Sequence, residues 1–190
     1  MTLKNNLIKM REEVNLCKKC KLCETRNNVV FGEGNINSKI MFIGEGPGEN
    51  EDIQGRPFVG RAGQLLDKML EVIDLSREKN FYITNIVKCR PPQNRDPEPD
   101  EQNACISYLY KQIEIINPQI IVALGRIAAK KLIDENFKVT TQHGIWVKKN
   151  NIYMMGTYHP AALLRFASKK EEAFKDFLNI REKLKELDLY

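Results

Sequence analysis

The spacing of five cysteines constrains the fold of this chain more than any other feature. Cys17, Cys20 and Cys23 follow one another at three-residue intervals near the N-terminus, and Cys89 and Cys105 lie in the middle of the chain. Grouped cysteines in a chain expected to stay in a reducing compartment indicate metal binding or catalysis rather than disulfides. A metal centre that held both residue 17 and residue 105 would close a long loop and fix the N-terminal segment against the middle of the fold.

Four thiolates could hold either of two metal centres. Zinc accepts four thiolates in a tetrahedral site, and Cys-x2-Cys is a common zinc knuckle. An iron–sulfur cluster accepts the same ligands. The spacing alone does not choose between them, and Cys23 could be either a further ligand or a bystander.

Length and composition predict one domain. The chain has 190 residues, of which 42% are hydrophobic and 29% charged, as in ordinary globular proteins. It has no apolar run long enough to span a bilayer, and residues 1–11 lack the apolar stretch of a signal peptide. We therefore expect a cytoplasmic protein without a membrane partner. The net charge of +5 is compatible with a polyanionic partner but does not identify one.

Hydrophobic periodicity predicts strands that alternate with helices. Buried strands are expected at 39–45, 81–87, 119–125 and 152–158, helices at 3–16, 62–73, 101–116, 126–135 and 170–187, and an edge strand within 138–149. Asp100 is the expected cap of the helix that follows it, and Phe174 is expected to face inward on the last helix. The pattern predicts an α/β fold, a three-layer α/β/α sandwich with a short, mostly parallel four-stranded sheet.

Unusual segments follow the predicted strands. They are GEGPG at 44–48, TNIVKCRPP at 84–92 and TYHPA at 157–161. The carboxyl ends of parallel strands meet at one edge of a sheet, and open α/β sheets bind their ligands there. The three segments together therefore predict a site at this edge.

The glycine-rich segment lets a ligand approach the backbone closely, and Glu45 is expected to project from it into the cleft. It lacks the spacing of a dinucleotide-binding or Walker A loop. We interpret Glu45 as functional, and the acids that follow it, among them Glu51 and Asp52, as a solvated surface.

Two ring side chains have both a structural and a functional interpretation. Phe58, in GRPFVGRAG, could anchor its loop in the core or provide a stacking platform for a planar ring. His159 precedes a proline that restricts its backbone, and it lies at the same expected edge as Asn85, which favours a functional role. His143, in a glycine turn, is interpreted as structural.

Together, these segments resemble the iron–sulfur type (family 4) uracil-DNA glycosylases. The resemblance rests on VVFGEG at 29–34, FIGEGPGENED at 42–52, GRPFVGRAGQLL at 55–66, TNIVKCRPPQNRDP at 84–97 and TYHPAALLR at 157–165. It implies an α/β/α sandwich with a [4Fe–4S] cluster, zinc being the alternative. The ligands that it implies are Cys17, Cys20, Cys89 and Cys105, and it leaves Cys23 outside the pattern as a bystander.

The resemblance further implies removal of uracil from single- or double-stranded DNA, which leaves an abasic site. The nucleotide must be flipped out of the duplex before its N-glycosidic bond can be hydrolysed. The family's stacking aromatic corresponds to Phe58, and the amide of Asn85 can match the N3–H and O4 edge of uracil. The backbone around Gly46 and Gly48 is expected to complete the uracil cradle.

Two residues are the expected catalytic groups. His159 would stabilise the negative charge on the departing uracil through its O2, and Glu45 would position or activate the attacking water. Leu163, Leu164 and Arg165 are expected to contact DNA, the leucines by entering the base stack and the arginine by holding a phosphate.

Other interpretations remain. A related branch traps uracil covalently through a histidine in an inserted loop, but residues 90–97, RPPQNRDP, lack the insertion and its histidine, so turnover is expected. A non-catalytic DNA-damage-binding module is the second alternative. An iron–sulfur electron carrier is the third, and it would have no use for Glu45, Asn85 and His159 at a strand edge. We expect a monomer, and a replication clamp is a conceivable partner that the sequence does not identify.

Overall fold

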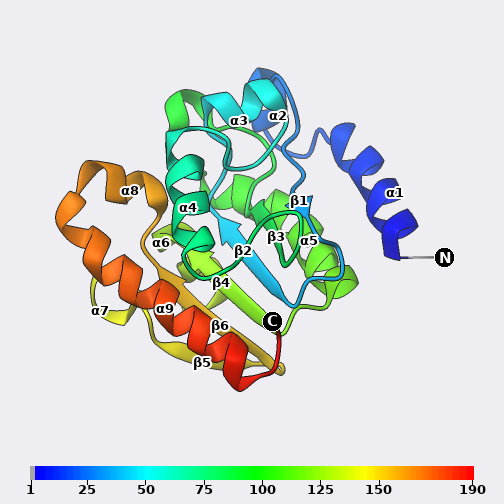
Figure 1. Ribbon diagram of the computed structural model, residues 1–190. Coiled ribbons are helices and arrows are strands. Elements are labelled where there is room, and N and C mark those ends of the chain that lie inside the picture. Colours follow the sequence, from blue (N-terminus) through cyan, green and yellow to red (C-terminus); the bar gives the residue numbers. More distant parts are fainter. Residues whose placement is uncertain (1–2) are drawn as a thin grey trace.

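The computed structural model describes residues 3–190 and has one mixed sheet with helices on both faces (Figure 1). The first two residues of the domain expected over 1–190 lie outside the described part. The strands are β1 (Glu33–Gly34), β2 (Ile40–Gly44), β3 (Phe81–Asn85), β4 (Ile120–Leu124), β5 (Trp146–Lys149) and β6 (Ile152–Thr157). The helices are α1 (Leu3–Asn15), α2 (Leu22–Thr25), α3 (Glu49–Gln54), α4 (Arg61–Glu71), α5 (Pro99–Ile116), α6 (Arg126–Leu132), α7 (Val139–Gln142), α8 (Pro160–Arg165) and α9 (Lys170–Glu186).

The sheet in the described residues has six strands, in the order β1-β3-β2-β4-β6-β5, rather than the four expected. The four middle strands are parallel and match the four predicted strands, while β1 and β5 pair antiparallel at the two edges. β5 falls in the expected edge-strand region, but the two residues of β1 are too few to show a periodicity. Gly34 permits the β1 pairing, because a Cβ on it would lie 2.2 Å from the carbonyl oxygen of Phe81.

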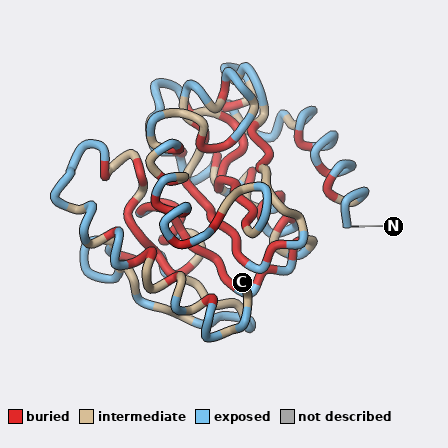
Figure 2. Tube along the Cα trace, viewed as in Figure 1, coloured by how far each residue is buried: buried red, intermediate tan, exposed pale blue. Residues whose placement is uncertain are grey.

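The strands separate two hydrophobic cores, and the buried strands lie between the helical layers (Figure 2). Met41 and Ile43 of β2 face one core with α1, α5 and α6, whereas Ile40 and Phe42 face the other with α4 and α9. This alternation along a strand is the period-two pattern of a sheet buried on both faces. Among residues 3–190, no helix has both the length and the apolar character that a membrane crossing requires.

Two details of the helices differ from expectation. Glu98, not Asp100, caps α5, because Pro99 takes the first helical position and the Glu101 carboxylate accepts a hydrogen bond from the Glu98 backbone N–H at 2.8 Å. Phe174 is exposed, because the buried stripe of α9 begins at the neighbouring Ala173.

His143 lies in the turn between α7 and β5. Its Nδ1 is 2.9 and 3.0 Å from the two carboxylate oxygens of Asp176, which holds the turn against α9. This is the kind of structural contact that its position in a glycine turn suggested.

Candidate functional site

A cleft of about 670 Å³ opens at the carboxyl edge of the parallel strands. Glu45 follows β2, Asn85 ends β3, Gly125 follows β4, and His159 follows β6 at a distance of two residues. Gly46, Gly48, Phe58 and Arg165 also line the cleft. The edge where the sequence predicted a site is therefore hollow, and nearly all of the candidate side chains meet there.

Glu45 is the acid in this cleft whose charge is most affected by its surroundings. Burial raises the pKa of Glu45 to about 7, and the negative charge of Asp96 adds to the rise. The charges of Arg126 and Arg165 act in the opposite direction. Near neutral pH the carboxyl is thus close to its midpoint, where it can take up or give off a proton.

His159 is held in one tautomer by the start of α8. Its Nδ1 accepts a hydrogen bond from the backbone N–H of Ala161 at 3.1 Å, so the neutral ring carries its proton on Nε2. Burial and the charge of Arg165 lower the pKa of His159 to about 4, against a smaller opposing effect of Glu51. The ring is therefore a neutral Nε2–H donor at neutral pH. Gly125 makes room for it, since a Cβ there would lie 2.8 Å from the His159 Cβ.

Asn85 and Phe58 form a slot for a planar ring. Asn85 is buried, and among residues 3–190 its Oδ1 finds no hydrogen-bond partner. A Cβ on Gly44 would lie 2.5 Å from both this oxygen and the Phe58 Cζ, so the glycine keeps the two close together. The Phe58 ring lies 5.8 Å from that of His159, centroid to centroid. A buried acceptor without a donor is costly, which points to a ligand that supplies one.

Phe58 sits in a backbone conformation that few side chains adopt, with a φ of +54°. Such a residue costs of order 1–3 kcal/mol and persists only where its surroundings hold it. Arg77 supplies this support by donating to the carbonyl oxygens of Pro57 and Phe58. The guanidinium is itself fixed by Glu33 at 2.8 Å and by Asp67 at 2.9 Å.

Two acids expected on a solvated surface tie loops together instead. The Glu51 carboxylate accepts hydrogen bonds from the backbone N–H groups of Val59 and Gly60, at 2.8 Å each, next to Phe58. Asp52 is buried and accepts from the backbone N–H of Asn27 at 2.9 Å. The first turn of α3 therefore organises the site, which its acidic sequence did not suggest.

The structure differs from expectation at Leu163. This side chain is only 1% exposed and packs into the core with α4 and α9, so it cannot enter a base stack. Leu164 is 39% exposed and Phe166, which was not among the candidates, is 61% exposed. Arg165 between them lines the cleft. Because one face of α8 must pack against the fold, adjacent leucines point in opposite directions.

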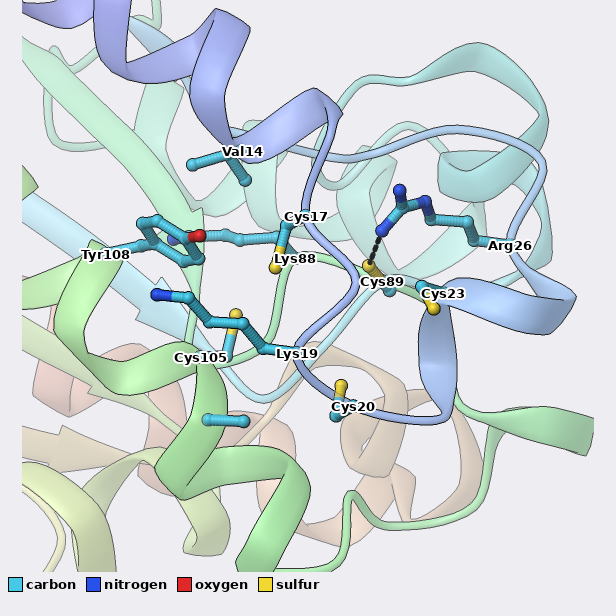
Figure 3. A pocket seen from close by; sticks show the side chains of 11 residues that line it. Val14, Cys17, Lys19, Cys20, Cys23, Arg26, Lys88, Cys89, Cys105 and Tyr108 are labelled. Carbon is cyan, nitrogen blue, oxygen red and sulfur yellow. Dashed lines mark hydrogen bonds between the residues drawn. The ribbon is translucent and has the colours of Figure 1, made fainter.

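All five cysteines line a second, small cavity (Figure 3). Cys17 and Cys20 come from the loop after α1, Cys23 from α2, Cys89 from the segment after β3, and Cys105 from α5. Among residues 3–190, no group of three or more potential ligands is arranged tightly enough for a single metal ion. The thiols instead surround a common space.

Three cationic side chains of the described residues, Lys19, Arg26 and Lys88, border the cysteine cavity (Figure 3). Arg26 Nη1 donates to the Cys89 Sγ at 3.2 Å. Burial raises the pKa of the Cys89 thiol to about 11, and Arg26 lowers it. Lys88 is buried beside Cys105 in the cavity wall. In the sequence, only the position of Lys88 next to Cys89 could have indicated that it lies at this cavity.

Comparisons with known proteins agree with one another. A model of the uracil DNA glycosylase superfamily matches residues 31–185. The type-4 uracil-DNA glycosylase of Sulfurisphaera tokodaii is 51% identical over 187 residues, which cover 94% of this chain and 84% of that relative. That of Saccharolobus solfataricus is 47% identical, with coverages of 95% and 87%. That of Thermotoga maritima is 50% identical over 81% of each chain.

Proposed function

This chain belongs to the uracil-DNA glycosylase superfamily, with type-4 enzymes as its relatives, and we propose that uracil is excised in the cleft at the strand edge. The protein is a DNA-repair glycosylase, which hydrolyses the bond between uracil and deoxyribose. The observation that carries the location is the Oδ1 of Asn85, which is buried beside the ring of Phe58 and has no hydrogen-bond partner within residues 3–190.

Asn85 and Phe58 recognise the flipped base in this proposal. The N3–H of uracil donates to the Asn85 Oδ1, the Nδ2 of the same amide donates to O4, and the ring of Phe58 stacks on the base. Cytosine presents an acceptor at N3 and an amino group at position 4, so both contacts would be mismatched. Buried groups left unpaired in this way are the strongest source of discrimination between similar ligands.

His159 stabilises the leaving group. Cleavage of the N-glycosidic bond moves negative charge onto uracil O2, and the neutral Nε2–H of His159 can donate to that oxygen. The hydrogen bond from Ala161 holds the ring in the tautomer that this requires. A fixed donor aimed at a developing oxyanion is typically worth about 10²- to 10³-fold in rate.

Glu45 directs the attacking water. Once ionised, its carboxylate can accept a proton from a water molecule and offset the positive charge that builds on the sugar. A pKa near 7 makes the group basic enough for this and still ionised in a useful fraction of molecules. Glu45 and His159 thus act on opposite charges of the same transition state.

The DNA around the flipped nucleotide meets α8 and the residue after it. Arg165 can hold a phosphate at the rim of the cleft, and the exposed side chains of Leu164 and Phe166 can enter the space that the base leaves. Leu163 packs into the core and holds α8 against the fold.

A [4Fe–4S] cluster, held by Cys17, Cys20, Cys89 and Cys105, is the cofactor in this proposal. Five thiols around one cavity and the hydrogen bond from Arg26 to Cys89 support it. The cluster would supply rigidity, by joining the N-terminal loop to the sheet within one domain. Iron and sulfide analysis with a visible absorbance spectrum tests this, and stoichiometric zinc in their place would contradict it.

We also place the enzyme in the cytoplasm, because its DNA substrate and reduced thiols belong to the same compartment. We propose that it acts as a monomer. Light scattering of the pure protein would reveal any larger assembly.

The decisive assay uses an oligonucleotide with one uracil, treated with alkali after incubation with the protein. We expect strand scission at uracil and none at thymine in the same position. A cluster-loaded protein that binds this DNA without scission would instead be the non-catalytic damage-binding module. An adduct that survives denaturing electrophoresis would indicate covalent trapping.

A further inference from the structure

Lys88 is buried between the cysteine cavity and the end of β3. Its Nζ donates to the Thr84 Oγ1 at 2.6 Å, to the Asn85 carbonyl oxygen at 2.8 Å and to the Gln112 Oε1 at 2.6 Å. The Thr84 hydroxyl and the Gln112 amide both donate to the carbonyl oxygen of Phe31 at 2.9 Å, so their remaining lone pairs face Lys88. All three N–H groups of an ammonium are satisfied by this arrangement.

These three acceptors are neutral and do not balance the charge of Lys88. A buried charge is costly unless an opposite charge lies nearby. Lys88 shares the wall of the cysteine cavity with Cys89 and Cys105, and a [4Fe–4S] cluster with four thiolate ligands is anionic. The buried cation thus fits an anionic group in that cavity.

We propose that Lys88 is a positioning residue that couples the cysteine-bound cluster to the uracil-reading Asn85. The inference rests on the proposed function, since it requires both the anionic cluster and the base slot. On one side the ammonium charge matches the cluster. On the other side its hydrogen bonds fix Thr84 and Asn85, the last two residues of β3.

The coupling matters because no partner from the described part of the chain holds the direction of the Asn85 Oδ1. The aim of this side chain therefore depends on its backbone, which Lys88 holds through the Asn85 carbonyl oxygen. If Lys88 acted only in folding, its replacement would not act on base recognition through Asn85. The dependence of uracil excision on both residues can be measured.

The test compares Lys88→Met, which keeps the length of the side chain but removes its charge and its donors, with Lys111→Met on the exposed face of α5. Three quantities are measured: iron and sulfide per chain, the midpoint potential of the cluster, and single-turnover excision at increasing enzyme concentration. Loss of a positive charge beside the cluster should lower the potential. We expect the ratio of the maximal single-turnover rate to the half-saturating enzyme concentration to fall about 10- to 100-fold on uracil-containing DNA, mostly through a higher half-saturating concentration, as for other partners of metal ligands. Lys111→Met should change none of these.

A double-mutant cycle separates positioning from general destabilisation. If Lys88 acts through Asn85, the Lys88→Met/Asn85→Ala double variant should be no slower than Asn85→Ala alone. Losses that multiply, or a potential equal to that of the wild type, would overturn the proposal. If Lys88→Met does not fold, Lys88→Gln keeps a polar group there and is judged by the same cycle. A wild-type protein without excision would refute the proposed function, while the potential would still test the match between Lys88 and the cluster.

Discussion

Replacing Glu45 by Gln should stabilise the folded protein while it slows excision. Burial and Asp96 raise the pKa of this carboxyl from 4.5 to about 7. The folded protein therefore binds the proton more tightly than the unfolded chain does. As pH rises from 4.5 to 7, Glu45 ionises in the unfolded chain before it ionises in the folded protein. The stabilisation that proton binding gives to the folded protein is therefore fully present below about pH 4.5 and is lost as pH rises through 7. The full pKa shift corresponds to about 3 kcal/mol of unfolding free energy that the wild type lacks at pH 8. Glutamine has no charge to bury, so Glu45→Gln should regain this free energy.

Thermal unfolding of the cluster-loaded proteins measures this difference. For a chain of this size, about 3 kcal/mol should raise the Tm of Glu45→Gln by roughly 6–12 °C at pH 8. At pH 5 the gain should be below about 1 kcal/mol, because the carboxyl is then largely protonated in the folded state. All scans need one heating rate, since loss of a cluster makes unfolding irreversible. Glu49→Gln, a change of an exposed acid nearby, is the matched control and should melt like the wild type at both pH values.

Single-turnover excision supplies the second half of the prediction. Loss of a general base typically slows a reaction by about 10²- to 10⁴-fold, so Glu45→Gln should fall within that range. A variant with wild-type rates would remove Glu45 from the mechanism. Equal Tm values for variant and wild type at pH 8 would show that the carboxyl is not held in a costly environment.

Four further substitutions test other parts of the protein. Gly44→Ala places a Cβ 2.5 Å from the Asn85 Oδ1, and we expect about a 100-fold loss of kcat/KM on a uracil oligonucleotide, whereas wild-type kinetics would show that the slot is not used. Asp96→Asn removes a charge that raises the pKa of the Glu45 carboxyl, so the acid limb of the single-turnover pH profile should move to lower pH; an unmoved limb would contradict the proposed role of Glu45. Phe166→Ala should slow excision from duplex more than from single-stranded DNA, whereas Leu163→Ala should lower stability by about 2–5 kcal/mol in urea titrations; equal effects of Phe166→Ala on both substrates would argue against a wedge.

The centre of the sheet was predictable because it obeys a local rule. β2, β3 and β4 are buried throughout, and β6 is buried in its second half, so each appears in the sequence as an apolar run of strand length ending in a turn. β1 follows no such rule, since its pairing depends on how Gly34 approaches β3. The cap of α5 was misplaced because Asp100 and Glu98 are both plausible acids, and only the reach of Glu101 decides between them.

The candidate site likewise has one part that follows from the sequence and another that depends on the tertiary fold. Glu45, Asn85 and His159 could be placed at one edge because parallel strands end together. The contacts of Lys88 with Gln112 and of Glu51 with the backbone of Val59 join separate elements of the fold, and no local spacing reveals them. Leu163 and Leu164 are alike in sequence, and only the packing of α8 decides which of them faces solvent.

The support of Phe58 by Arg77 has a consequence for inherited variation. Arg77 comes from the segment between α4 and β3, and it does not line the cleft. A change at this position would release a strained residue whose ring stacks on the base in our proposal, although nothing at the cleft surface had been altered. A screen for cells that accumulate mutations from unrepaired uracil would therefore recover Arg77 variants together with variants of the cleft residues. Distance from the substrate would then be a poor guide to which alleles are harmful.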